Sequence, residues 1–140
     1  VKSFQGKQKL IDVASEGNRP KIKSCPVTII VAYDINYYKY IPLLAPHIDS
    51  DKVKIQSVQE RDKFARELSW LQAGYVLIAA RMLGLDCGPM NGFNNTLADE
   101  TFYSGTNWRS NILINLGYGD HKTLHPRAPR IDFENACQIL

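Results

Sequence analysis

The chain is organised around the stretch Leu83-Gly84-Leu85-Asp86-Cys87-Gly88-Pro89-Met90-Asn91-Gly92-Phe93. The apolar segment 61–83 runs into it and is expected to form one helix, and Asn94 or Asn95 is expected to cap the next helix, through Phe102. Between them, Gly88-Pro89-x-x-Gly92 predicts a turn with an open main chain, because glycine occurs where another group must approach the backbone. A flat cofactor lying on exposed N–H groups is one explanation. Taken alone, the turn favours a plain connection between elements.

The segment 61–83 predicts a helix that is buried on most sides. Phe64, Leu68, Leu71 and Tyr75 repeat at helical spacing, and past Leu71 the sequence is apolar almost all round. In a single domain of 140 residues, one way to bury such a helix is to pack part of it against a second copy of the chain. The expected position of this long helix is therefore a dimer interface.

Two apolar runs predict strands. Residues 25–33 are continuously apolar and rich in β-branched side chains, which is typical of a central strand covered on both faces. Residues 110–119 form a second run that ends in Gly117-x-Gly119. That short motif is not a dinucleotide-binding fingerprint, because no helix opens behind it and the spacing differs.

Helical spacing also predicts a helix over residues 5–16, ended by Gly17-Asn18 in a left-handed cap, and a closing helix over residues 133–140. Residues 49–59 are polar and predict a loop. Helices and strands are mixed, without an internal repeat. The expected class is therefore α+β (mixed α/β), with a central sheet flanked by helices in one domain.

Composition narrows the function classes. The net charge of +3 is mild and lacks the basic stripe of a nucleic-acid binder, and the run Lys21-Ile22-Lys23 is interpreted as a solvated edge. The apolar segment 71–83 is too short for a membrane span, and no signal peptide is visible. Cys25, Cys87 and Cys137 form no CxxC pair, which predicts free, packed thiols in a reducing cytoplasm.

Few residues offer catalytic chemistry of their own. The three histidines show no metal-ligand spacing, and no nucleophile elbow is present, so a hydrolase is hard to support. An enzyme remains possible where a cofactor does the chemistry and the chain positions it. The candidates for positioning are the turn at 88–92 and the segment His125-Pro126-Arg127, since an arginine fork suits a phosphate group. A solvent-facing arginine explains that segment equally well.

Several ordered motifs carry a family resemblance over nearly the whole chain. They are Gln72-Ala73-Gly74-Tyr75, Ala79-Ala80-Arg81-x-Leu83-Gly84-Leu85-Asp86-x-Gly88-Pro89-Met90-x-Gly92-Phe93, Ser110-Asn111, Asn115-Leu116-Gly117-Tyr118-Gly119-Asp120 and Pro126-Arg127-x-Pro129-Arg130. Together they resemble the nitroreductase-like FMN-dependent flavoproteins. Within that family the subgroup of malonic semialdehyde (3-hydroxypropanoate dehydrogenase-type) reductases is most similar.

The resemblance implies an FMN-dependent homodimer with the flavin at the subunit interface and NAD(P)H as reductant. Pro89, Met90, Asn91 and Gly92 match the segment whose backbone lies along the flavin ring, with an N–H near Asn91 or Gly92 facing flavin N5. Arg127 matches an arginine that holds the FMN phosphate, and His125 falls where many relatives have a second basic residue. The sequence departs from the family at Asn91, often acidic there, and at His125, which replaces a lysine.

The implied activity is hydride transfer from NAD(P)H through flavin N5 to a small aldehyde, a nitro compound or a quinone, with no side chain as the catalytic group. Family members normally begin with an arginine-rich stretch that precedes the part matched here. Residues 1–140 are therefore expected to be one nitroreductase-like domain that lacks the N-terminal portion of the family fold. The alternative is a non-catalytic dimerisation or binding module that keeps the fold without a complete flavin site.

Overall fold

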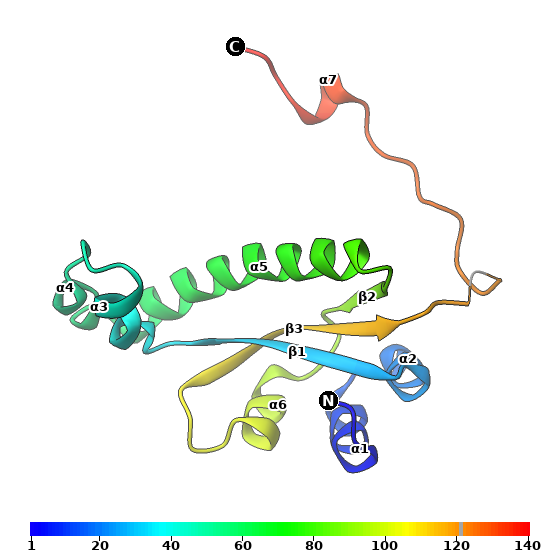
Figure 1. Cartoon of the computed structure of the whole chain (residues 1–140), viewed down its shortest axis with the longest axis horizontal. Helices are drawn as coiled ribbons and strands as arrows, with labels where there is room; N and C mark the ends of the chain where they lie inside the picture. Colours follow the sequence, from blue (N-terminus) through cyan, green and yellow to red (C-terminus); the bar gives the residue numbers. More distant parts are fainter. Residues whose placement is uncertain (121) are drawn as a thin grey trace.

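The computed structural model of the protein describes residues 1–120 and 122–140. Three antiparallel strands, β1 (Val27–Asp34), β2 (Asp86–Met90) and β3 (Trp108–Gly117), form a sheet in the order β1-β3-β2. The long helix α5 (Val58–Met82) lies on one face, and α1 (Phe4–Val13), α2 (Arg19–Ser24) and α6 (Asn95–Phe102) lie on the other (Figure 1). The predicted α+β class with a sheet flanked by helices is confirmed.

The central strand is β3, so the prediction that the run 25–33 occupies the centre was wrong. Residues 110–114 of β3 are all buried, whereas β1 is mostly half-buried at the edge. The apolar side chains of β1 are explained by its two faces, because Ile29 packs against the α5 side and Ile30 against the α1 side. The continuous apolar run therefore indicates that both faces of the strand are covered. An edge strand can also be covered on both faces.

The Gly-Pro-x-x-Gly segment was predicted as a turn, and most of it is strand β2. Asp86–Met90 pairs antiparallel with β3, with Pro89 opposite Ile114. Proline has no N–H to donate to a ladder, and an edge strand tolerates it for that reason. The reversal between helix and strand lies earlier, at Gly84, whose φ of 79° is in the left-handed region that favours glycine.

Helix α5 begins three residues before the predicted start at Arg61. Ser57 and Glu60 form a capping box, in which the Glu60 N–H donates to Ser57 Oγ (3.2 Å) and the Ser57 N–H donates to Glu60 Oε2 (2.8 Å). The polar segment before it contains the short helices α3 (Ile41–Leu44) and α4 (Ser50–Lys54), together with a 3₁₀ turn at Tyr37–Tyr40. The predicted loop over 49–59 is thus partly helical.

The two faces of α5 differ in the size of their side chains. Ala65, Ser69, Ala73 and Ala80 are buried, and such small side chains allow a helix to lie close to a sheet. A set of large apolar side chains is exposed to between 60% and 83%, namely Leu71, Tyr75, Ile78 and Met82. A single chain therefore covers only part of the helix that was predicted to be buried on most sides.

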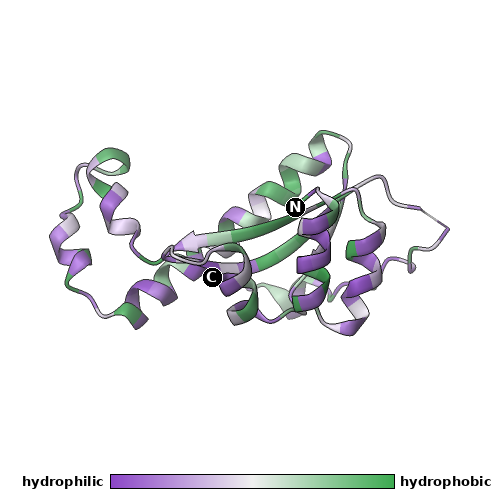
Figure 2. Cartoon of the chain, turned by 90° about the horizontal axis from the view of Figure 1, so that it is seen from below, coloured by the Kyte–Doolittle hydropathy of each residue, from purple (hydrophilic) through white to green (hydrophobic). Residues whose placement is uncertain are grey.

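The core on the opposite face of the sheet joins α1, α2, α6 and β3. Leu10, Ile22 and Leu113 are fully buried there, with Met90 at the edge of the same cluster. Figure 2 shows the two long strands coloured largely as hydrophobic, between helices of mixed colour. Helix α1 ends at Val13, because Ala14 is extended and bridges Phe93. The predicted left-handed cap at Gly17-Asn18 was wrong, since neither residue has a positive φ.

The C-terminal segment 122–140 is exposed along its whole length and runs away from the sheet (Figure 1). Its helix α7 (Phe133–Ala136) has four residues, shorter than the predicted helix over 133–140. An isolated helix of that length gains little without tertiary packing. Cys137 lies on this segment and is exposed, whereas Cys25 and Cys87 are half-buried, so the packing role predicted for all three thiols is wrong for Cys137.

No helix within residues 1–120 and 122–140 is long and apolar enough to cross a membrane.

Candidate functional site

The segment that follows β2 is held by three hydrogen bonds to the carbonyl oxygen of Gly92, and we call this group of hydrogen bonds the clamp. This oxygen accepts hydrogen bonds from the Ser15 N–H (2.9 Å), the Ser15 hydroxyl (2.7 Å) and the Asn18 side-chain amide (3.0 Å). Beside it, the Asn94 N–H donates to the Val13 carbonyl at 2.9 Å. The end of β2 is therefore fixed to the end of α1, and Asn91 is presented at the surface between them.

The clamp explains why residue 92 is glycine. A Cβ atom at this position would lie 2.5 Å from Ser15 Oγ and 2.7 Å from Asn18 Nδ2, both of which bind the Gly92 carbonyl. The groups that approach the Gly92 backbone closely are therefore side chains of the same chain, Ser15 and Asn18. At Gly88 the nearest atom would be Asn115 Cβ at 3.4 Å, an ordinary contact.

A positive charge lies beside the clamp. Lys21 Nζ is 3.4 Å from Asn18 Oδ1, and the Asn18 amide in turn binds the Gly92 carbonyl. The interpretation of Lys21 as a plain solvated edge residue missed this position. Asn18 and Gly92 are 74 residues apart, and no local pattern reports a contact over that separation.

The residues predicted to lie along a flavin ring are adjacent at the end of β2. Met90 is buried, Gly92 is half-buried, and Pro89 and Asn91 are exposed. Pro89 and Met90 share a cavity of about 340 Å³ with Lys21 and Leu124. We call this cavity the β2–β3 recess. His125 is the next residue after Leu124, and Arg127 lies two residues further on. Both are exposed, and neither belongs to the wall of this cavity, so a single chain does not join the two predicted groups in one pocket.

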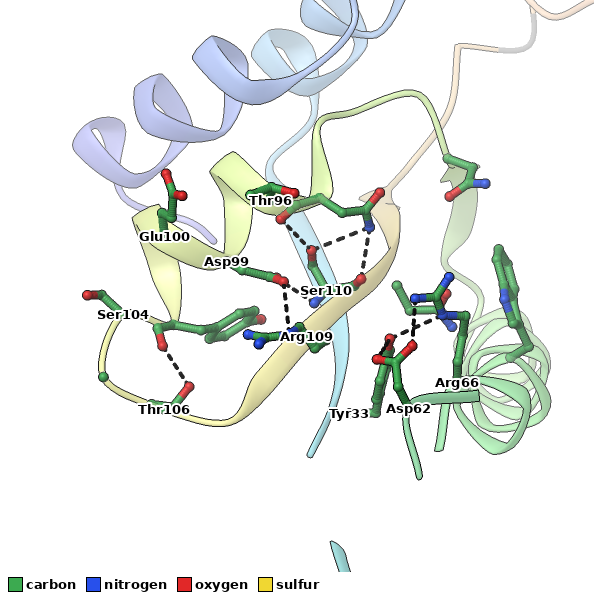
Figure 3. A pocket seen from close by; sticks show the side chains of 16 residues that line it. Tyr33, Asp62, Arg66, Thr96, Asp99, Glu100, Ser104, Thr106, Arg109 and Ser110 are labelled. Carbon is green, nitrogen blue, oxygen red and sulfur yellow. Dashed lines mark hydrogen bonds and ion pairs between the residues drawn. The ribbon is translucent and has the colours of Figure 1, made fainter. Parts of the chain in front are cut away.

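A larger cavity of about 860 Å³ lies on the other side of Asn91, between α5, α6 and the ends of β1 and β3 (Figure 3). We call it the α5–α6 recess. Its wall includes Tyr33, Asp62, Arg66, Asn91, Asp99 and Arg109. No local pattern in the sequence predicted this recess, because its residues come from four separate elements.

A connected polar cluster forms one wall of the α5–α6 recess. The Tyr33 hydroxyl donates to Asp62 Oδ1 at 2.9 Å and accepts from Arg66 Nε at 3.1 Å. Arg66 also binds Asp62 Oδ2 at 2.9 Å, one helical turn away. Burial raises the pKa of Tyr33 above its ordinary value of 10.0, so this phenol is protonated at neutral pH and serves as a donor to the carboxylate.

The opposite wall is built where α6 meets β3. Asp99 Oδ1 accepts from the Ser110 N–H at 2.6 Å, and Asn95 Nδ2 donates to the Ser110 carbonyl at 2.8 Å. The other oxygen of Asp99 lies 4.0 Å from Arg109 Nε. Each arginine of the recess is thus paired with a carboxylate. No group of three or more His, Cys, Asp or Glu side chains within residues 1–120 and 122–140 is arranged to hold a metal ion.

Two curated relatives are similar to the chain over its full length. A protein of Stutzerimonas stutzeri (strain A1501) named "Putative NADH dehydrogenase/NAD(P)H nitroreductase" is 47% identical over 139 residues, which cover 99% of this chain and 71% of the relative. The chain belongs to this nitroreductase family. A protein of the same name from Ralstonia nicotianae (strain ATCC BAA-1114 / GMI1000) is 44% identical, over 100% of this chain and 72% of the relative. No family model matches the chain.

Solved nitroreductase structures share the fold at low sequence identity. A candidate nitroreductase from Bacillus subtilis has a TM-score of 0.83 and 18% identity, over 100% of this chain and 75% of that chain. A candidate NAD(P)H:FMN oxidoreductase from Staphylococcus epidermidis ATCC 12228 has a TM-score of 0.82 and 16% identity, covering 100% and 73%. A candidate nitroreductase in complex with FMN from Exiguobacterium sibiricum 255-15 has a TM-score of 0.77 and 16% identity, covering 100% and 74%.

These relatives confirm the resemblance at the level of the family, which is a family of oxidoreductases. The narrower resemblance to malonic semialdehyde reductases stays a prediction.

The clamp on this nitroreductase-family chain can be tested by Gly92→Ala. The added methyl group displaces Ser15 Oγ and Asn18 Nδ2 from the Gly92 carbonyl, and we expect the free energy of unfolding to fall by about 2 kcal/mol. Gly88→Ala is the matched control, with an expected loss below about 1 kcal/mol. Urea denaturation of both variants measures the difference. Equal stability of the two variants would contradict the clamp.

Proposed function

We propose that this nitroreductase-family protein is an FMN-dependent NAD(P)H oxidoreductase with a small aldehyde of the malonic semialdehyde type, a nitro compound or a quinone as acceptor. The observation that carries the proposal is the hydrogen-bonded main chain at Gly92 beside the exposed Asn91, with Asn91 in the wall of the α5–α6 recess and Met90 in the wall of the β2–β3 recess. The names of the relatives and the FMN held by one structural neighbour support it.

The residues around Asn91 fit one edge of a flavin. Outside the strand ladder, the N–H groups of Asn91 and Gly92 donate to no other residue in the described part of the chain. They are therefore available to a ligand acceptor such as flavin N5. Lys21 adds a positive charge on the same side of the clamp, where it would stabilise the negative charge of a reduced ring.

The phosphate end of FMN would require basic side chains that lie beyond the β2–β3 recess. Leu124 lines this recess together with Pro89, and His125 is the next residue along the chain. Arg127 follows two residues later, and its guanidinium group can bind a phosphate through two parallel hydrogen bonds. We propose that the exposed segment 122–132 brings His125 and Arg127 to the phosphate.

When bound, FMN would supply the redox chemistry that links oxidation of NAD(P)H to reduction of the acceptor. The chain supplies position and electrostatics. The clamp fixes the position of the backbone at Asn91 and Gly92, so the N–H dipoles of these residues are oriented before a ligand binds. The buried sheet behind Met90 excludes water from one side.

We propose that a second copy of the chain covers the exposed apolar face of α5. Leu71, Tyr75, Ile78 and Met82 lie on this face, and full burial of such side chains contributes about 1.5–3 kcal/mol each. A dimer contact there would also account for the sequence pattern of a helix that is apolar almost all round. The three free thiols are consistent with a cytoplasmic location for this dimer.

The central test is reduction of bound flavin. We expect purified full-length protein to be yellow and to lose its visible flavin absorbance when NADH or NADPH is added without oxygen, because hydride transfer removes the oxidised chromophore. Addition of an aldehyde, nitro or quinone acceptor should then restore the absorbance. A folded, full-length dimer that is colourless and quenches no added flavin fluorescence would instead support a binding module without catalysis.

The phosphate contact is tested with Arg127→Gln. Removal of a charge-assisted hydrogen bond should weaken FMN binding by roughly tenfold or more in a flavin fluorescence titration. Arg130→Gln removes the same charge three residues later on the same exposed segment and serves as the control. If both variants bind FMN like the unaltered protein, Arg127 has no part in the site.

The partner surface is tested with Ile78→Asp. A carboxylate in the middle of the apolar face should shift the dimer to monomer in sedimentation velocity, because burying an unpaired charge is costly. Phe4→Asp introduces the same charge at another exposed apolar side chain, on α1, and should leave the dimer intact. A stable Ile78→Asp dimer would place the interface elsewhere.

A further inference from the structure

The α5–α6 recess has the size and position of a binding site for a large ligand that also reaches the proposed flavin edge. Its volume of about 860 Å³ falls in the range of pockets that hold nucleotide-sized molecules. Asn91 belongs both to its wall and to the segment proposed to face flavin N5. A ligand in the recess can therefore extend one end to the place of hydride transfer.

The charges of the recess disfavour an additional phosphate. Arg66 is paired with Asp62 at 2.9 Å, and Arg109 Nε lies 4.0 Å from Asp99. Glu100 also lines the recess, so the lining carries three carboxylates and two guanidinium groups and has one surplus negative charge. A phosphate group placed here would meet repulsion from the carboxylates and would compete with them for both arginines.

The lining suits a sugar that carries free hydroxyl groups. Carboxylate oxygens accept hydrogen bonds from hydroxyls, and the recess offers carboxylates at Asp62 on one wall and at Asp99 on the opposite wall. Trp70 is 41% exposed at the same recess and presents a flat ring on which a base can stack. The lining thus combines acceptors for hydroxyl groups, an aromatic face and no surplus positive charge.

We propose that the α5–α6 recess binds the adenosine ribose of the reductant and selects NADH over NADPH. The two reductants differ only at the ribose 2′ position, which is a hydroxyl in NADH and a phosphate in NADPH. The carboxylates accept the hydroxyl and repel the phosphate. This inference rests on the proposed function, because the other end of the same reductant must meet the flavin beside Asn91.

The test uses redox-inactive fragments, so that binding is measured without hydride transfer. ADP-ribose and its 2′-phosphate are titrated into full-length flavoprotein by calorimetry. We expect ADP-ribose to bind more tightly, by about fivefold or more. Glu100→Arg reverses one charge of the lining and should shift the ratio of the two affinities by about tenfold toward the 2′-phosphate. Asp51→Arg, a charge reversal on exposed α4 outside the recess, is the matched control and should leave the ratio unchanged.

Tighter binding of the 2′-phosphate by the unaltered protein would overturn the inference. So would a Glu100→Arg ratio equal to that of Asp51→Arg. Both results leave the proposed function intact when NADH and NADPH still reduce the flavin. Conversely, selective binding of ADP-ribose to a protein whose flavin no nicotinamide reduces would support the recess and remove the oxidoreductase proposal.

Discussion

The hydrogen-bonded carbonyl of Gly92 is the constraint on which the candidate site depends. Three donors from Ser15 and Asn18 meet this one oxygen, and the residue that carries it has no room for a side chain. The fully buried Leu10 anchors α1 in the core. The clamp therefore attaches the backbone beside the exposed Asn91 to an element that the core holds in place. Asn91 lines the α5–α6 recess and Met90 lines the β2–β3 recess, so this attachment lies at a point where the two recesses approach each other along the chain.

A polar network that begins at the buried Thr28 holds the backbone of Lys21 in a similar way. The Thr28 hydroxyl donates to Asn115 Oδ1 at 2.6 Å, and the Asn115 amide donates to the Lys21 carbonyl at 3.0 Å. Thr28 is fully buried, and an unmade hydrogen bond there would be expensive. Within the described residues, no buried side-chain nitrogen or oxygen lacks a partner. Strand β3 therefore holds α2 through the side-chain amide of Asn115, which accepts from the Thr28 hydroxyl and donates to the Lys21 carbonyl.

Local signals in the sequence were enough for part of this structure. Asn94 caps α6 as expected, since its side chain accepts from the Leu97 N–H, and the apolar run before Gly117 forms β3. The capping box at Ser57 is also a local signal. The pattern Ser57-x-x-Glu60 predicts a helix that begins at Val58, where α5 does begin. These features depend on neighbours within one helical turn or one strand.

Contacts between distant segments could not be predicted in the same way. The strand order and the strand identity of Asp86–Met90 depend on pairing with β3, and Gly-Pro in a single sequence favours a turn until that partner is known. Gly92 shows the same limit, because a glycine that admits a ligand and a glycine that admits Ser15 look alike in sequence. The role of residues 89–92 along a flavin ring stays a prediction, and the side-chain amide that holds the Gly92 carbonyl lies 74 residues earlier in the chain.

Helix α5 shows how one element serves two requirements. Its small side chains, Ala65, Ser69 and Ala73, lie against the sheet and leave the polar Asp62 and Arg66 at the wall of the α5–α6 recess. Past Leu71 the outward side chains become large and apolar, which costs free energy as long as water contacts them. A helix face that contacts only solvent normally carries polar side chains. The side chains of α5 that contact solvent thus change from Asp62 and Arg66 beside the recess to Leu71, Tyr75, Ile78 and Met82 beyond it.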